Sequence, residues 1–583
     1  MTENPKSKIQ NPGSRILWLL FALLIVFVYF FGLTLPLLGP DEPRYAQVAR
    51  EMYLRGDWIT PTLGGFDWFE KPALLYWLEI ASYKIFGVSE FAARFGSAVF
   101  GLGTIACLWI LGKSVSGFRF QVSGEKIEIL KQTSEIQKPE TRDLEPETRN
   151  LKPETRNLKP ETSVFANWLA LIAASSIGLI VFSRGASFDI ILTFPITAAL
   201  VCYFLFESLL QKHYFCAVPN SIVLSKSTAA NLIAAAPPIA WASLFLAGFY
   251  FFIGFALLAK GLIGLIFPLT IVFFYHLLKF ELLPGKVFLI SLIWGTIISL
   301  LVASIWYLPM YRAHGWKFVD EFFIQHQFQR FTSDKYQHQQ PFWFFFVVLP
   351  LMTLPWLPFF LASIWNFFKV QGSRFKVQSS RFNVQGSNNL STLDSRLAPF
   401  AFAWLAVPLV FFSLSGSKLP GYILPALPGA IVLTAIYVAD FVRKSRTRTR
   451  VLQIAAASTF LFVFVGLQFF AADYTNYETV KNMIAAADAK GFADAEFVSL
   501  YTVSHNLEFY AAGRLERDAD GKLKRYDDFS VLIKAVKTAG DQRILVVVPQ
   551  ANVPNLQKEN DLADIETIAE NGESAIILIK PKR

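Results

Sequence analysis

Charged and aromatic side chains are concentrated in residues 38–72, directly after an apolar run that begins at Ile16. The stretch reads LGPDEPRYAQVAREMYLRGDWITPTLGGFDWFEKP. Tryptophan and basic side chains collect at membrane interfaces as anchors, but a carboxylate beside lipid is costly and needs a partner or a chemical task. Asp41 and Glu70 are therefore the first candidates for chemistry. The stretch predicts an active site at a membrane surface.

Three further ionisable residues, Asp189, Lys260 and Lys418, stand at the ends of apolar runs. Asp189 heads its run in RGASFDIILTF, where a carboxylate can also act simply as a helix cap. A lysine at such a boundary commonly extends its ammonium group toward water. Lys418 differs because prolines follow it in SKLPGYILPALPG and break the helix. Irregular backbone at membrane depth is tolerated only where it is buried in protein or lines a cavity.

A second polar segment begins at Glu321 and reads EFFIQHQFQRFTSDKYQHQQ. A metal ion would take acid and imidazole ligands, and His326 together with Glu70 could supply two. The alternative is an interfacial imidazole whose hydrogen bonds are satisfied by the protein. Two ligands from distant loops leave both interpretations open.

The composition excludes a soluble domain. Of 583 residues, 54% are hydrophobic and only 17% are charged, which predicts a polytopic membrane protein. The formal net charge of +10 is explained by basic residues in cytoplasmic loops, so no nucleic-acid partner is expected. The three cysteines have no metal-binding spacing, and the hydrophilic C-terminal part has none, which excludes a disulfide scaffold there.

Apolar runs predict eleven membrane spans, within an expected total of about 11–13. A cytoplasmic N-terminus places residues 37–91 and 311–340 outside, and it places the basic segments 367–397 and 443–450 inside. The odd number of spans places the C-terminus outside. The short apolar segment Leu74 to Phe86 is expected to be a helix at the interface. The runs are 16–36, 92–113, 164–183, 189–209, 239–258, 262–279, 287–310, 341–365, 398–414, 421–442 and 451–471.

Two of the predicted inside segments, 118–163 and 367–397, contain tandem repeats with a period of seven residues. The first, KPETRDLEPETRNLKPETRNLKPET, has a proline in each unit and no second apolar position, so it cannot form a coiled coil. We expect both segments to be disordered insertions without a catalytic role.

The character of the chain changes after Ala472. EFVSLY, RILVVVP and SAIILIK are typical of strands, and YETVKNMIAAADAKG and FSVLIKAVKTAG are typical of amphipathic helices. Residues 1–471 are therefore expected to form a transmembrane catalytic domain, and residues 472–583 a small α/β domain. Nothing in the second domain has a catalytic pattern.

Six motifs carry a family resemblance: DEPRYAQVAREM, GDWITPTLGGFDWFEKPALLYW, RGASFDIILTF, AKGLIG, EFFIQHQFQRF and SKLPGYILPALP. In this order they resemble the bacterial lipid A aminoarabinose transferases. Those belong to the polyprenyl-phosphate-sugar glycosyltransferases of the GT-C fold, which also include protein O-mannosyltransferases. The resemblance covers about residues 14–472, and a similar α/β domain follows. It implies a multi-pass protein of the bacterial inner membrane, with its active site and α/β domain in the periplasm.

The resemblance also implies roles for single residues. Asp41 is the candidate base, and Asp189 lies in the same site. Lys71 and Arg330 would bind the phosphate of the donor. A divalent metal ion seen in some relatives would lie near Glu70 and His326, and no organic cofactor is implied. Further substrate-binding candidates are Glu42, Arg44, Lys260, Lys418 and Tyr422.

The chemistry fits this pattern independently. A glycosidase needs an acid because its leaving group is a poor one, whereas a polyprenyl phosphate leaves readily. It needs cations to stabilise the departing phosphate and one carboxylate to take the proton of the acceptor. The expected activity is transfer of a sugar, with inversion, from a polyprenyl phosphate to an acceptor, in the first place a lipid A-type glycolipid. The alternatives are a protein acceptor or, in another class, a lipid or solute transporter.

Overall fold

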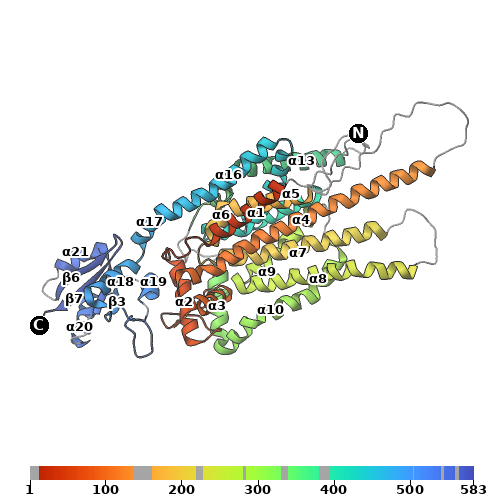
Figure 1. Cartoon of the computed structure of the whole chain (residues 1–583). Helices are drawn as coiled ribbons and strands as arrows, with labels where there is room; N and C mark the ends of the chain where they lie inside the picture. Colours follow the sequence, from red (N-terminus) through yellow and green to blue (C-terminus); the bar gives the residue numbers. More distant parts are fainter. Residues whose placement is uncertain are drawn as a thin grey trace, which may run out of the picture.

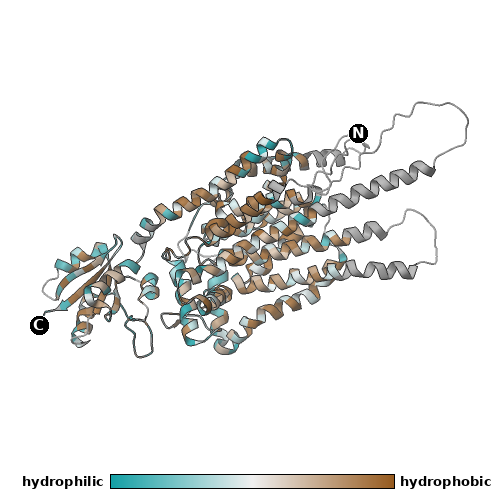
Figure 2. Cartoon of the chain, viewed as in Figure 1, coloured by the Kyte–Doolittle hydropathy of each residue, from teal (hydrophilic) through white to brown (hydrophobic). Residues whose placement is uncertain are grey.

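A computed structural model gives the fold of the chain. It describes residues 12–136, 161–217, 228–279, 284–329, 339–379, 394–502, 504–511, 513–539, 544–558 and 563–582. Helices run side by side through the larger part of the molecule, and the short helices α2 and α3 lie at one end of them (Figure 1). The α/β domain lies beyond that same end. Brown, hydrophobic residues dominate the long helices in Figure 2, whereas hydrophilic residues gather around α2 and in the α/β domain.

The long helices of the described chain belong to the expected transmembrane part, and short helices connect them. The N-terminal half contains α1 (Pro12–Phe30), α2 (Asp41–Arg55), α3 (Leu74–Phe86), α4 (Glu90–Ile136), α5 (Glu161–Ser175), α6 (Ile177–Ser183), α7 (Phe188–Ala217), α8 (Thr228–Lys260) and α9 (Ile263–Leu278). There follow α10 (Lys286–Val319), η1 (Asp320–Gln329), α12 (Phe344–Met352), α13 (Leu357–Ser379), α14 (Asp394–Ser413), η2 (Pro420–Ala426), α15 (Leu427–Arg443) and α16 (Arg446–Val465).

The polytopic helical architecture predicted from the apolar runs is confirmed. Among the described residues, seven helices are long and apolar enough to cross a membrane, or up to nine if each of two bent pairs is one span. The other two predicted runs form shorter apolar helices, Ile16–Phe30 and Ile263–Leu278. Each of the eleven predicted runs thus coincides with an apolar helix or a bent pair. At 1.5 Å per residue, the two short helices alone fall below the roughly 30 Å of a bilayer core.

Two predicted spans are broken rather than straight. One bends by 62° between α5 and α6, and the other bends by 118° between α12 and α13. The two breaks meet, because the Ile177 amide donates to the Leu354 carbonyl at 2.9 Å and the Trp356 indole donates to Ser175 Oγ at 2.9 Å. Backbone groups freed at one break are thus satisfied at the other, as the interior of a membrane protein requires.

The segments expected to be disordered insertions differ in part from that expectation. Helix α4 continues through Ile136 and α13 through Ser379, so the first part of each segment is helical. Neither part contains proline, which removes the usual reason for a helix to stop. Most of the first repeat array (138–160) and the end of the second (380–387) lie outside the described residues.

The polar end of the helical part is built from α2, a small hairpin and α3. Strands β1 (Thr62–Leu63) and β2 (Phe66–Asp67) pair antiparallel around Gly64 and Gly65. Both glycines have positive φ, 63° and 82°, which a tight two-residue hairpin turn requires and other residues rarely adopt. Helix α3 covers the residues predicted for an interfacial helix, and its Tyr83 hydroxyl donates to the Ala46 carbonyl of α2 at 3.1 Å.

The C-terminal part is an α/β domain, as predicted. Its five-stranded sheet has the order β4-β3-β5-β7-β6, in which β4, β3 and β5 are parallel and the other pairs antiparallel. The strands are β3 (Glu496–Leu500), β4 (Arg525–Tyr526), β5 (Ile544–Pro549), β6 (Ala563–Glu570) and β7 (Ser574–Pro581). Between the last span and the sheet lie η3 (Gly466–Phe470), which ends that span, and α17 (Ala471–Glu478). The helical elements of the domain are α18 (Lys481–Ala487), η4 (Asp488–Phe492), α19 (His505–Tyr510), α20 (Phe529–Ala539), η5 (Gln550–Asn552) and α21 (Val553–Lys558).

The three apolar segments predicted as strands form β3, β5 and β7, and they supply the buried residues of both sheet faces. The sequence analysis missed β6, whose sequence ADIETIAE is acidic and has only two fully buried positions. Pairing with β7 holds it in the sheet. Tertiary context, not propensity, therefore determines this strand.

Candidate active site

Helix α2 begins at the charged motif that follows the first apolar helix. Pro40 precedes it, Asp41 and Glu42 occupy its first turn, and Gly56 ends it in the left-handed conformation. Acids in the first turn interact favourably with the positive end of a helix, and a glycine is the usual left-handed terminator. Asp41 thus stands at the N-terminus of α2, one turn before Arg44, and the two form an ion pair. The Asp41 side chain is half exposed, at 50%.

Arg44 connects this turn with the residues that follow the hairpin. Its guanidinium lies 5.3 Å from the ring centroid of Tyr45 and 5.7 Å from that of Trp68. Burial lowers the pKa of Arg44, but Glu70, Tyr45 and Asp41 raise it by more, so its pKa lies above the ordinary value. Arg44 is therefore a permanent cation among carboxylates and rings.

Glu70 and Lys71 form a second, more buried ion pair. Lys71 Nζ lies 2.9 Å from Glu70 Oε1, and the two side chains are only 11% and 7% exposed. Glu70 also acts on α2, because burial first, and then the charges of Glu70 and Asp41, raise the pKa of the Tyr45 hydroxyl well above its usual value. The segment between α1 and α4 thus brings Asp41, Arg44, Glu70 and Lys71 together.

Asp189, Lys260 and Tyr422 come together from three different helices. Lys260, the last residue of α8, pairs with Asp189 in the first turn of α7. Its ammonium also lies 4.6 Å from the ring centroid of Tyr422 in η2. Gly421 is required beside this pair, since a Cβ built on it would lie 1.9 Å from an Asp189 oxygen. The carboxylate of Asp189 therefore orients a cation, in contrast to the simple helix cap considered from sequence.

An aromatic contact joins the two clusters. The ring of Phe188, next to Asp189, packs edge-on against Tyr45 with centroids 4.8 Å apart and against Tyr76 with centroids 5.4 Å apart. Helix α2 thus rests on the start of α7. The sequence-predicted acids Asp41 and Asp189 consequently belong to one region of the molecule.

Glu42, predicted to bind substrate, has a structural set of contacts instead. It pairs with Arg94 at 2.6 Å and accepts hydrogen bonds from the amides of Leu38 (2.9 Å) and Ala186 (2.8 Å). Burial raises the pKa of Glu42, but Arg94 and the amides lower it by more, so the net pKa is below the usual value. Arg94 also donates to the carbonyls of residues 33, 35 and 36. The pair ties α2, α4 and the chain before α7 together.

The remaining predicted residues have different environments. Lys418 is buried and donates to the Ser415 carbonyl at 2.6 Å, so it stabilises the irregular turn before η2. His326 lies in η1. The next residue of η1, Gln327, accepts a hydrogen bond at 3.0 Å from the amide of Leu262, two residues after Lys260, so η1 lies close to the end of α8. Arg330 follows η1 and lies outside the described residues.

The described residues do not fit the divalent metal site inferred from Glu70 and His326. No group of three or more His, Cys, Asp and Glu side chains that could hold a metal ion is found in the part of the chain that the structure describes. Glu70 also has Lys71 at 2.9 Å and lies within the field of Arg44. Two fixed cations oppose the approach of a third, so we derive no catalytic step through a metal.

Sequence reasoning missed Arg94, Tyr45 and Glu79. The sequence did point to Arg94, since an arginine near the start of an apolar run needs a buried partner. It also showed a carboxyl group, that of Glu79, on the predicted interfacial helix. Nothing in the sequence showed that the Glu79 side chain points inward. Glu79 is fully buried, and neither of its oxygens has a hydrogen-bond partner among the described residues. Burial first, and then the charge of Glu42, raise the pKa of Glu79 well above its usual value.

The described residues have the architecture of a polytopic membrane protein with the GT-C fold, with charged side chains gathered at one end of its helices and a C-terminal α/β domain. No family model matches the chain. The fold matches the crystal structure of ArnT from Cupriavidus metallidurans bound to undecaprenyl phosphate with a TM-score of 0.68. The match covers 96% of this chain and 97% of that one, at 18% identity.

Curated relatives resemble the chain in sequence. One is undecaprenyl phosphate-alpha-4-amino-4-deoxy-L-arabinose arabinosyl transferase 2 of Proteus mirabilis, which is 27% identical over 76% of this chain. The corresponding transferase of Yersinia enterocolitica is 28% identical over 78% of this chain. The matches cover 62% and 64% of those two proteins, so the chain spans somewhat less than two thirds of their length. The resemblance inferred from the six motifs is thus confirmed.

The buried acid Glu79 gives a stability prediction. Because its folded pKa is raised, the folded protein keeps this proton while the unfolded chain loses it as the pH rises above the ordinary glutamic acid value. Glu79 should therefore cost stability as the pH increases, by at most about 1.4 kcal/mol per pH unit. Glu79→Gln, which is neutral at every pH, should unfold at a higher temperature than the wild type at pH 8 and close to it at pH 4.5. Thermal unfolding in detergent micelles at both values measures this. A difference that is the same at both pH values would contradict it.

Proposed function

We propose that the chain is an inverting glycosyltransferase that moves a sugar from a polyprenyl-phosphate donor to a lipid A-type glycolipid. The observation that carries the proposal is the gathering of Asp41 with the cations Arg44, Lys71 and Lys260 at one end of the helices. The names of the curated relatives and the undecaprenyl phosphate of the fold neighbour support the donor class.

Binding of the donor phosphate is assigned to Lys71, Lys260 and Arg44. Each cation is already held by a carboxylate: Lys71 by Glu70, Lys260 by Asp189 and Arg44 by Asp41. Such partners fix the cations before the lipid arrives, which reduces the ordering cost of binding. Arg330 joins this set by resemblance alone. Glu42 and Lys418 are left out, because their contacts serve the fold.

The reaction needs one base. The acceptor oxygen attacks the anomeric carbon, the bond from that carbon to the phosphate oxygen breaks, and the polyprenyl phosphate leaves with both electrons. Asp41 takes the acceptor proton, because its side chain is far more exposed than that of Asp189, at 50% against 16%. Asp189 holds Lys260, and the cations stabilise the charge that grows on the phosphate. A single displacement inverts the anomeric carbon.

The protein is proposed to lie in a bacterial inner membrane, with a cytoplasmic N-terminus and with its active site and α/β domain in the periplasm. The basic residues around the α15–α16 junction support this orientation, because positive charge favours the cytoplasmic side. That junction lies at the end of the helices opposite to α2 (Figure 1).

The first test concerns the base. Asp41→Asn keeps the size of the side chain but cannot accept a proton, so turnover should fall about 10²- to 10⁴-fold while donor binding persists. Transfer from undecaprenyl-phosphate aminoarabinose to lipid A, followed by mass spectrometry, measures this. Asp527→Asn, the same change at an exposed position of the α/β domain, is the control. Near-normal turnover by Asp41→Asn would remove the assignment.

A second test concerns the donor phosphate. Charge-assisted hydrogen bonds contribute about 1.5–3 kcal/mol, so Lys71→Met and Lys260→Met should each weaken undecaprenyl phosphate binding roughly 10- to 100-fold. If both bind one phosphate, the double variant should lose less than the sum of the single losses. Lys580→Met, which breaks an exposed ion pair far from the site, should bind normally. Strictly additive losses would mean that the two lysines do not share a ligand.

A third test concerns orientation. A reporter enzyme that is active only in the periplasm, fused after Arg583, should be active, because the α/β domain is proposed to lie outside. A matched fusion to a reporter that is active only in the cytoplasm should be silent. The opposite pair of results would reverse the proposed orientation.

A further inference from the structure

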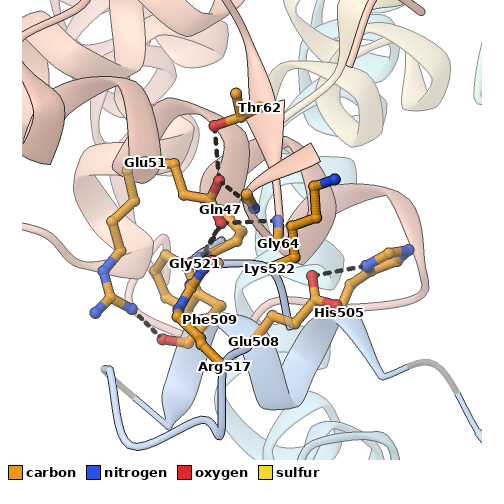
Figure 3. A network of polar contacts seen from close by, with 12 residues as sticks. Gln47, Glu51, Thr62, Gly64, His505, Glu508, Phe509, Arg517, Gly521 and Lys522 are labelled. Atoms are coloured by element: carbon orange, nitrogen blue, oxygen red, sulfur yellow. Dashed lines mark hydrogen bonds and ion pairs between the residues drawn. The ribbon is translucent and has the colours of Figure 1, made fainter. Parts of the chain in front are cut away.

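Glu51 has an unusual set of contacts for a residue that the proposed chemistry does not use. It lies on α2, and its side chain is only 10% exposed. Oε1 accepts hydrogen bonds from Gln47 Nε2 at 3.1 Å and from the Gly64 amide at 2.8 Å. Oε2 accepts from Thr62 Oγ1 at 2.7 Å and from the Gly65 amide at 3.2 Å (Figure 3).

The four hydrogen bonds to Glu51 show whether this residue can react with a substrate or only positions other residues. A carboxylate has about four lone-pair sites, and four donors already occupy those of Glu51. No site remains for a proton or a ligand, so Glu51 does not act on a substrate directly. Its hydrogen bonds instead join two segments: α2, which begins with Asp41, and the hairpin, which leads within a few residues to Lys71.

The α/β domain holds the other side of the same hairpin. The Leu523 amide donates to the Gly64 carbonyl at 3.0 Å, and Arg517 lies 3.9 Å from Glu51 Oε1. A Cβ built on Gly65 would come within 2.7 Å of the Gly521 carbonyl oxygen. A glycine is therefore needed at position 65 both for its positive φ and for the close approach of the domain.

The domain also contacts α2 and its surroundings at further points. Arg50 of α2 donates to the Phe509 carbonyl at 2.7 Å. The Tyr510 hydroxyl accepts from the Leu37 amide, just before α2, at 2.8 Å and donates to Glu90 of α4 at 3.2 Å. The domain thus contacts the chain before α2, the later part of α2 and the hairpin after it.

We propose that Glu51 is a positioning residue and that the α/β domain acts on the transferase site through it. The domain presses the Gly64–Gly65 turn onto Glu51, and this fixes Lys71 relative to Asp41. The inference rests on the proposed function, because it concerns the geometry between the base and a phosphate-binding lysine. It gives a task to a domain in which we find no catalytic pattern.

Misplacement of a catalytic group by about 1 Å can cost on the order of 100-fold in rate. Glu51→Gln replaces one accepting carboxylate oxygen by an NH₂ group. This hydrogen-bond donor would then face the donors that the lost oxygen had accepted from. Gly65→Ala leaves Glu51 unchanged and forces the turn away from Gly521. Both variants should loosen the hairpin while leaving every proposed substrate contact chemically intact.

The experiment uses the full chain in detergent or nanodiscs and measures three quantities for each variant. Hydrogen exchange in residues 62–71 should become at least roughly tenfold faster. Turnover should fall about 100-fold, whereas the Kd for undecaprenyl phosphate should rise less than about tenfold, because alignment matters most in the transition state. Thr62→Val, which removes one hydrogen bond to Glu51 without changing size, should give a smaller effect of the same pattern and covers the case in which Glu51→Gln does not fold.

Glu566→Gln removes an exposed carboxylate from the far end of the sheet and should change none of the three quantities. Faster hydrogen exchange with turnover within threefold of the wild type would reduce Glu51 to a purely structural role and overturn the proposal. Slow turnover with unchanged hydrogen exchange would also overturn it. A wild-type protein that neither binds undecaprenyl phosphate nor transfers a sugar would instead contradict the proposed function, and the exchange data would still report whether Glu51 holds the hairpin.

Discussion

The structure depends on one electrostatic constraint: a charge placed beside lipid must have a partner. An uncompensated ion in such surroundings costs several kcal/mol, and removing one partner of a buried pair costs about 3–5 kcal/mol. Three ion pairs of the described site follow this rule: Arg94 with Glu42, Lys71 with Glu70 and Lys260 with Asp189. Two of these pairs, Arg94 with Glu42 and Lys260 with Asp189, join helices that are distant in sequence, so the contacts that make these charges tolerable also assemble the site.

Much of the fold could be predicted from the sequence because it follows from local patterns. Apolar length determines where helices cross a membrane, and the short continuous apolar runs at β3, β5 and β7 are typical of strands buried on both faces. The charged loop after the first run also had a clear physical signal, since carboxylates beside lipid require an explanation. Asp41 and Asp189 were found in this way, and the structure brings them into one region.

The sequence could not show which charged side chains contact one another in the folded protein. No local sequence pattern shows that Glu42 pairs with Arg94 or that Lys418 donates a hydrogen bond to a backbone carbonyl. Both residues were therefore predicted to bind substrate, although the contacts that the structure shows for them stabilise the fold. The same limit hid Glu51, whose neighbours Thr62 and Arg517 lie far apart in the chain. The breaks at α5–α6 and α12–α13 were missed as well, since each is satisfied by the other and not by its own neighbours.

The contact between the Gly64–Gly65 turn and the α/β domain has a consequence for biosynthesis. The hairpin and α2 leave the ribosome early, whereas Arg517, Gly521 and Leu523 are added near the end of the chain. During translation the polar loop therefore emerges without the surface that later holds it. The contacts that hold this loop are completed only after the α/β domain has been synthesised and folded, so a product truncated before that domain would carry Asp41 and Lys71 in a loop that lacks them.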